Sequence, residues 1–144
     1  MVSYVDMETP MTARPRVLII DDDEIFVALL TEVLAPFYDV VSGRNGHEGL
    51  RFCRSSCVDM IVTDIGMPEL DGIQMLEEFQ KDKALASIPV LVVTATHFSQ
   101  RNRAEVERFP QVCGIMCKPL NVDAMAGRIN KILKERRGAG PPAK

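Results

Sequence analysis

The sequence has no tryptophan, and it lacks any hydrophobic run long enough to cross a membrane. A membrane-spanning helix needs about 20 consecutive apolar residues, and no stretch of the 144 residues approaches that length. The first 15 residues also lack the apolar segment of a secretory signal peptide. These absences predict cytoplasmic localisation, and the chain length is that of one domain with a full hydrophobic core.

Positive charge is also in deficit, because 17 Lys and Arg residues face 20 Asp and Glu residues, which gives a net charge of -3. Domains that bind nucleic acid usually carry a basic excess, so we expect no direct nucleic-acid binding and no membrane partner. Five of the basic residues lie from Lys131 onward beside one acidic residue, which leaves a net charge of -7 on residues 1–130. This basic end suits a helix C-terminus followed by a solvated tail. Docking of an acidic partner is the alternative.

Short apolar runs alternate with segments of helical spacing along the chain. The strong runs, three of them rich in Val and Ile, show no polar alternation, so they predict strands buried on both faces of a parallel sheet. They span residues 17–20, 60–62, 90–93 and 114–117, and a weaker run spans 38–41. Five β–α repeats predict an α/β fold. We expect a doubly wound, flavodoxin-like (βα)5 sandwich whose five-stranded parallel sheet has the order 2-1-3-4-5.

Apolar stripes and capping residues predict the helices. The first stripe comprises Ile25, Phe26, Leu29, Leu30, Val33 and Leu34. The expected N-caps are Asp23, Asp71, Ser99 and Asn121, and Asn45 or Gly46 is expected to open a short second helix. The helix after residue 99 has few apolar residues, Val106 and Phe109, so we expect it to be loosely held. The domain is predicted at residues 16–137, with a flexible extension at 1–15 and a flexible tail or linker at 138–144.

The cysteines do not have the C-x2-C spacing of the common zinc modules. The sequence has two C-x3-C pairs instead, and the alternating fold places the pairs on different parts of the molecule. We interpret all four as small, partly buried hydrophobic residues in a reducing compartment: Cys53, Cys57, Cys113 and Cys117.

Polar side chains gather where the predicted strands end. Asp21 and Asp22 follow the first strand, Asp64 ends the third, Thr94 ends the fourth and Lys118 ends the fifth. In doubly wound sheets the carboxyl ends of the strands form the functional crevice. Neighbouring carboxylates repel one another, so the cluster needs a cation, and a few oxygen ligands suit Mg²⁺. Carboxylate, metal, ammonium and hydroxyl together match the requirements of phosphoryl transfer.

Four stretches carry a family resemblance: VLIIDDDE, MIVTDIGMPELDG, IPVLVVTAT and CGIMCKPL. Over residues 16–136 the chain resembles the receiver domains of bacterial two-component response regulators. The site residues that this resemblance implies are Asp64 as phosphoryl acceptor, Asp21, Asp22, Asp64 and the Gly66 carbonyl as Mg²⁺ ligands, and Thr94 and Lys118 as the switch pair.

The resemblance also implies a function. The domain takes a phosphoryl group from a sensor histidine kinase or a histidine phosphotransfer protein, with Mg²⁺ as cofactor. It then switches a surface that a downstream effector protein or domain recognises. It promotes its own phosphorylation and dephosphorylation only, so it is not an enzyme acting on other substrates.

Two positions qualify the resemblance. Ile115 stands where many such domains have Tyr or Phe, so an aromatic relay from Thr94 is unavailable, and we expect the signal to depend on the loop at residues 95–100. Gly66, two residues after Asp64, has no side chain that would shield an acyl phosphate from water. We therefore expect a short-lived phosphorylated form.

Three alternatives are open at this point. The stretch DDDEI at residues 21–25 resembles the DxDx[TV] nucleophile motif of haloacid-dehalogenase-type phosphatases, although Ile25 breaks its last position. A receiver that has lost phosphorylation would be a binding module only, yet every expected site residue is present. The domain can also be the input part of a longer regulator, because these motifs do not specify kinase, output or oligomeric state.

Overall fold

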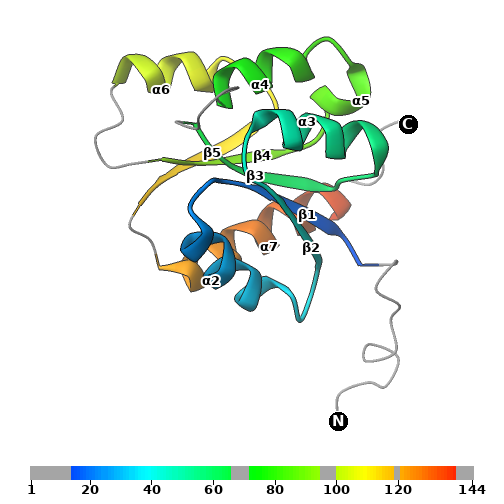
Figure 1. Cartoon of the computed structure of the whole chain (residues 1–144), viewed down its shortest axis with the longest axis vertical. Coiled ribbons are helices and arrows are strands. Elements are labelled where there is room, and N and C mark those ends of the chain that lie inside the picture. The colour runs from blue at the N-terminus through cyan, green and yellow to red at the C-terminus, as the bar shows by residue number, and fades with distance from the viewer. Residues whose placement is uncertain (1–13, 66–71, 95–99, 119–120, 139–144) are drawn as a thin grey trace.

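The structure, a computed structural model, describes residues 14–65, 72–94, 100–118 and 121–138. Its centre is a five-stranded parallel sheet with the order β2-β1-β3-β4-β5 (Figure 1), which confirms the predicted order. In chain order the strands are β1 (Arg16–Ile20), β2 (Asp39–Gly43), β3 (Met60–Asp64), β4 (Val90–Thr94) and β5 (Val112–Cys117).

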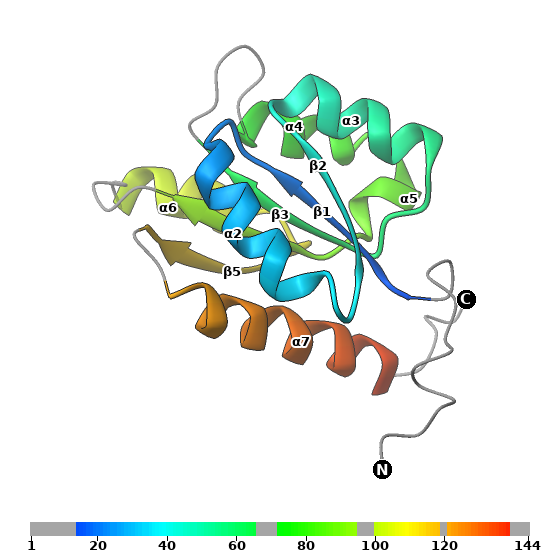
Figure 2. The same ribbon diagram turned by 60° about the horizontal axis from the view of Figure 1, so that its bottom comes forward.

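Helices cover both faces of the sheet, so the fold is the predicted doubly wound α/β sandwich (Figures 1 and 2). One face carries α2 (Glu24–Leu34) and α7 (Val122–Gly138). The other face carries α3 (Gly46–Ser55), α4 (Gly72–Phe79), α5 (Lys83–Ala86) and α6 (Gln100–Glu107). Within the described ranges, no helix combines the length and apolar character that a membrane span requires.

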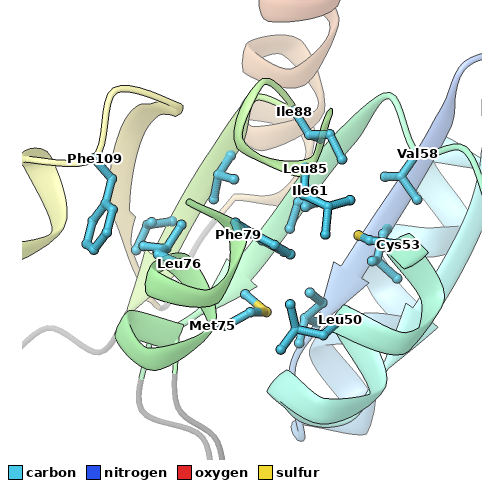
Figure 3. Packing of buried hydrophobic residues seen from close by; sticks show 14 of the residues in the cluster. Leu50, Cys53, Val58, Ile61, Met75, Leu76, Phe79, Leu85, Ile88 and Phe109 are labelled. Atoms are coloured by element: carbon cyan, nitrogen blue, oxygen red, sulfur yellow. The ribbon is translucent and has the colours of Figure 1, made fainter. Parts of the chain in front are cut away.

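Two hydrophobic clusters fill the space between the sheet and its helix layers. Figure 3 shows the first cluster, in which Phe79 of α4 packs with Leu50 of α3 and Ile61 of β3. In the second cluster, Leu30 of α2 and Ile129 of α7 pack against the opposite face. The central strands β1, β3 and β4 are buried almost throughout. Burial on both faces explains why their sequences are continuously apolar.

The helix α2 buries a narrower stripe than the sequence predicts. Phe26, Leu30 and Leu34 are buried, but Ile25 is 74% exposed and Leu29 is 48% exposed. The prediction was therefore wrong for these two residues. A helix that packs on one sheet face buries only the stripe that points to the core, and Ile25 and Leu29 lie beside that stripe.

The helix α5 is an element that the sequence does not predict, because its four residues are too few to form an apolar stripe. Asp82 caps its N-terminus. The buried side chain of Gln111 donates hydrogen bonds to the Leu85 and Ile88 carbonyls and accepts one from Gln80. These bonds satisfy a buried amide and fix α5 against the start of β5.

The expected N-caps Asp23 and Asn121 are confirmed, since each side chain accepts hydrogen bonds from backbone N–H groups in the first helical turn. Of the two expected starts of α3, Asn45 is the N-cap and Gly46 the first helical residue. Asp71 and Ser99 lie outside the described residues, as do residues 1–13 and 139–144 of the predicted flexible ends. In the α6 region, Val106 and Phe109 are both buried.

The cysteines lie on different parts of the fold, as predicted, and all four are free thiols. Cys53 of α3 is buried, but the other three are exposed: Cys57, Cys113 and Cys117. The expectation of partly buried side chains was therefore wrong for these three, because Cys57 follows α3 in a surface connection and β5 is an edge strand.

Candidate functional site

The register of the sheet aligns the carboxyl ends of its strands. Ile20 at the end of β1 stands opposite Thr63, and Thr94 at the end of β4 stands opposite Cys117. Strands β1, β3, β4 and β5 are consecutive neighbours in the sheet. The polar residues at their carboxyl ends therefore meet at one edge: Asp21, Asp64, Thr94 and Lys118.

Asp21 is the most buried carboxylate at this edge, with a side chain only 1% exposed. Burial is the main cause that raises the pKa of Asp21 above its usual value. Hydrogen bonds from Lys118 and from the Asp23 N–H lower this pKa, whereas the negative charge of Asp64 raises it further. The Asp21 backbone N–H donates to the Gly43 carbonyl at 3.0 Å, which fixes this residue beside the end of β2. The carboxylate thus depends on Lys118 to offset its burial.

Three carboxylates form a cluster that could bind a metal ion. Asp21, Asp22 and Asp64 each offer an oxygen within 4.8 Å of the other two, and their side chains are respectively buried, exposed and half-buried. Such a set of hard oxygen donors, open to solvent on one side, fits a divalent cation that keeps part of its water shell. Gly66, whose carbonyl was the fourth expected ligand, lies outside the described residues.

Lys118 is the cation nearest to the cluster in the described structure. Its Nζ lies 2.7 Å from Oδ2 of Asp21 and 3.9 Å from Oδ2 of both Asp64 and Asp23. The same ammonium lies 4.6 Å from the centre of the Phe26 ring, in the range of a cation–π contact. Its closest carboxylate is therefore Asp21, a partner that the sequence did not predict, and Phe26 supports it from α2.

Backbone and hydroxyl contacts fix the ends of β3 and β4. The Thr94 side chain is buried, and its carbonyl accepts a hydrogen bond from the Lys118 N–H at 2.6 Å. The Thr63 hydroxyl donates to the Asp64 carbonyl at 2.9 Å. A Cβ on Gly72 would come within 2.8 Å of that same carbonyl, so only glycine fits there without a shift of backbone. Thr63 carried no sequence signal, whereas Gly72 belongs to the motif MPELDG.

Ile115, the expected departure from an aromatic residue, is partly buried and packs against the cluster beneath α4 and α6. The signal is expected to depend on the loop at residues 95–100, of which residues 95–99 lie outside the described residues and Gln100 begins α6. The described part of the site therefore consists of three carboxylates, a lysine and a buried threonine at the sheet edge.

Comparison with known proteins agrees with this geometry. The family model described as "Response regulator receiver domain" matches residues 17–130. The transcriptional regulatory protein PhoP of Bacillus subtilis, named for alkaline phosphatase synthesis, is 30% identical over 134 residues, covering 88% of this chain and 51% of PhoP. The polar-differentiation response regulator DivK of Brucella anthropi is 30% identical over 118 residues, covering 81% of this chain and 94% of DivK. This chain thus spans about half of PhoP but nearly all of DivK.

A solved structure has the same fold. A response regulator receiver domain protein (CheY-like) from Methanospirillum hungatei superposes with a TM-score of 0.79 at 22% identity, covering 89% of this chain and all of that one. The chain belongs to the response regulator receiver domain family. Its function is that of a receiver domain in two-component signalling, and this family generally does not consist of classical enzymes.

Proposed function

We propose that Asp64 is the residue of this receiver domain that accepts a phosphoryl group. The observation that carries the proposal is the combination of accessibility and cationic contact at this carboxylate. The Asp64 side chain is 15% exposed and lies 3.9 Å from the Lys118 ammonium, whereas Asp21 is 1% exposed and already pairs with Lys118 at 2.7 Å. A nucleophile must be reached by its substrate, and Asp64 meets that requirement better than Asp21.

The donor is a phosphohistidine of a sensor histidine kinase or a histidine phosphotransfer protein. A carboxylate oxygen of Asp64 attacks the phosphorus atom, the phosphorus–nitrogen bond breaks, and the imidazole nitrogen leaves with the bonding electron pair. The product is an acyl phosphate on Asp64. Because donor and acceptor are both anionic, the reaction requires positive charge at the site.

Mg²⁺ is the cofactor that this donor set suits. Asp21, Asp22 and Asp64 would hold the ion, with the Gly66 carbonyl as a further ligand. When bound, the ion would neutralise negative charge on the carboxylates and on the phosphoryl oxygens. Lys118 supplies a second positive charge, 3.9 Å from Oδ2 of Asp64.

Thr94 and Lys118 are the residues that respond to phosphorylation. The new phosphoryl group attracts the Lys118 ammonium away from Asp21, and the Thr94 hydroxyl donates to a phosphoryl oxygen. These movements alter the surface formed by α6, β5 and α7, which a downstream effector recognises. The domain acts alone or within a larger regulator, in the cytoplasm, where the phosphorylated donor is made.

Phosphatase activity on external substrates is the weaker candidate. It would require Asp21 as the nucleophile, but that carboxylate is buried and hydrogen-bonded to Lys118. We therefore propose that the domain turns over only its own acyl phosphate and is not an enzyme for other molecules.

The proposal is tested by incubating the protein with acetyl phosphate and Mg²⁺, then measuring its intact mass. We expect one added phosphoryl group in the wild type and none in Asp64→Asn. Asp123→Asn is the matched control, since it removes one exposed carboxylate in the first turn of α7 that is not a member of the cluster. An adduct that persists in Asp64→Asn would refute the assignment.

A further inference from the structure

A second charged feature lies at the other end of the sheet, between α7 and the edge strand β5. It is a shallow pocket of about 420 Å³, which falls within the usual size range of ligand sites. Three cations line it, Arg128, Lys131 and Arg136, together with the acid Glu135. The pocket therefore carries a net charge of about +2 in a chain whose net charge is -3.

Two of the cations are held in place by the backbone. Nη2 of Arg128 donates to the Cys113 carbonyl at 3.2 Å, and Nη2 of Arg136 donates to the Ser87 carbonyl at 2.9 Å. The Arg128 guanidinium also lies close over Gly114, where an added Cβ would come within 2.6 Å of Nη2. Each contact uses one of the five N–H donors of a guanidinium, so both side chains are positioned while donors are left for a ligand.

Glu135 offsets part of the positive charge of the pocket, and a positive excess remains. Among the residues whose positions are described, no carboxylate oxygen lies within 4.0 Å of the charged nitrogens of Arg128, Lys131 or Arg136. Other basic residues of the fold, such as Arg16 and Arg108, do have such partners. The pocket thus keeps a positive excess, because its acid Glu135 offsets one of the three positive charges without forming an ion pair with them.

We propose that this pocket is a docking site for an acidic segment of a partner protein. The cations extend from Arg128 to Arg136, a distance of about 12 Å along the α7 axis. That span exceeds the reach of a single phosphate group, and it suits Asp or Glu carboxylates spaced along a peptide. Guanidinium groups bind carboxylates through two parallel hydrogen bonds, which gives the contact geometric selectivity.

Docking at this pocket leaves the phosphorylation site free. Cys113 and Lys118 are separated by roughly 17 Å along β5, and α7 runs beside that strand in the opposite direction (Figure 2). This separation is about twice the screening length at physiological ionic strength. Phosphorylation of Asp64 therefore changes the electrostatic potential at the pocket little. Because β5 and α7 also belong to the surface that we propose to change on phosphorylation, any effect of phosphorylation on docking comes from movement of these two elements.

The test uses a fluorescein-labelled octaglutamate peptide and fluorescence anisotropy on the whole chain at low ionic strength. Arg128→Gln and Lys131→Gln should each weaken binding about fivefold, which is the effect of one exposed ion pair. Lys134→Gln is the matched control, because it removes one charge from an exposed position of α7 outside the pocket. We expect it to weaken binding less than about twofold.

Gly114→Ala tests whether the position of the Arg128 guanidinium matters apart from its charge, because the added Cβ displaces the guanidinium without changing the net charge. We expect it to weaken peptide binding, with unchanged far-ultraviolet circular dichroism. The proposal is overturned if the peptide does not bind, if Lys134→Gln weakens binding as much as Arg128→Gln, or if Gly114→Ala binds like the wild type. It is also overturned if tripolyphosphate binds with the expected variant pattern and the peptide does not, because the site would then serve a phosphate ligand.

Discussion

Replacing Lys118 by methionine tests how the fold tolerates the buried charge of Asp21. The Lys118 ammonium donates to Asp21 at 2.7 Å, and the Asp21 side chain is 1% exposed. Removal of one partner from a buried ion pair costs about 3–5 kcal/mol, because the other charge is left unpaired. Lys118 is itself 21% exposed, and Asp21 can take up a proton. We therefore expect the lower end of the range, a loss of about 3 kcal/mol in the free energy of unfolding.

The assay is urea unfolding at neutral pH with EDTA, followed by circular dichroism. A loss of about 3 kcal/mol corresponds to a midpoint lower by about 1.5 M when the slope is near 2 kcal/mol/M. The double variant Asp21→Asn/Lys118→Met should recover most of the loss, since no buried carboxylate is left without its lysine. The two single variants and the double variant then form a complete mutant cycle.

Acid should reduce the effect of Lys118→Met. Burial raises the pKa of Asp21 in the folded state, so its carboxyl group is protonated more readily there than in the unfolded chain. The penalty for the unpaired charge is therefore absent below the unfolded pKa, near 4, and grows as pH rises above it. The reasoning is refuted if Lys118→Met unfolds within about 0.5 kcal/mol of the wild type at neutral pH, or if the double variant is as unstable as Lys118→Met.

Three further predictions concern neighbouring positions. Without divalent metal, the stability of the wild type relative to Asp21→Asn should fall as pH rises above about 4, because the raised pKa of Asp21 means that its neutral form favours folding. Adding Mg²⁺ at neutral pH should restore this lost stability of the wild type, measured in a thermal melt. Gly72→Ala should lower the unfolding free energy by about 2 kcal/mol, because its Cβ would press on the Asp64 carbonyl. Its control, Gly127→Ala, has nothing within 4 Å of the added Cβ and should gain up to about 1 kcal/mol in urea unfolding. Gly66→Arg should slow the loss of phosphoryl mass, and decay at the wild-type rate or faster would contradict the shielding argument.

The strands and the position of the candidate site could be predicted from the sequence because local patterns locate the strands, and the general rules for doubly wound sheets supply their order. Strands β1, β3 and β4 are buried on both faces, so their apolar runs are continuous. Once these runs are recognised as parallel strands, their carboxyl ends must meet at one edge of the sheet. Asp21, Asp64 and Lys118 follow from that rule without any knowledge of side-chain contacts.

What could not be predicted depends on competition between nearby groups. Three carboxylates lie within 4.0 Å of Lys118, and the closest is the buried Asp21 at 2.7 Å, with Asp64 and Asp23 at 3.9 Å. The apolar residues Ile25 and Leu29 have the same helical spacing as Phe26 and Leu30, yet they are exposed because α2 contacts the sheet along one narrow stripe. Sequence spacing identifies which apolar residues of the helix could be buried, but the direction in which α2 faces the sheet determines which of them are.

The distribution of charge gives the two proposed sites different relations to the same partner. The acidic cluster lies at the carboxyl ends of the strands, and the basic pocket lies beside the start of β5 and the Ser87 carbonyl before β4. An acidic segment is repelled by the first site and attracted to the second, so a partner that carries one is oriented before it makes close contact. Because the sites are about two screening lengths apart, the charge of a phosphoryl group on Asp64 has little effect on this orientation, which is instead sensitive to salt.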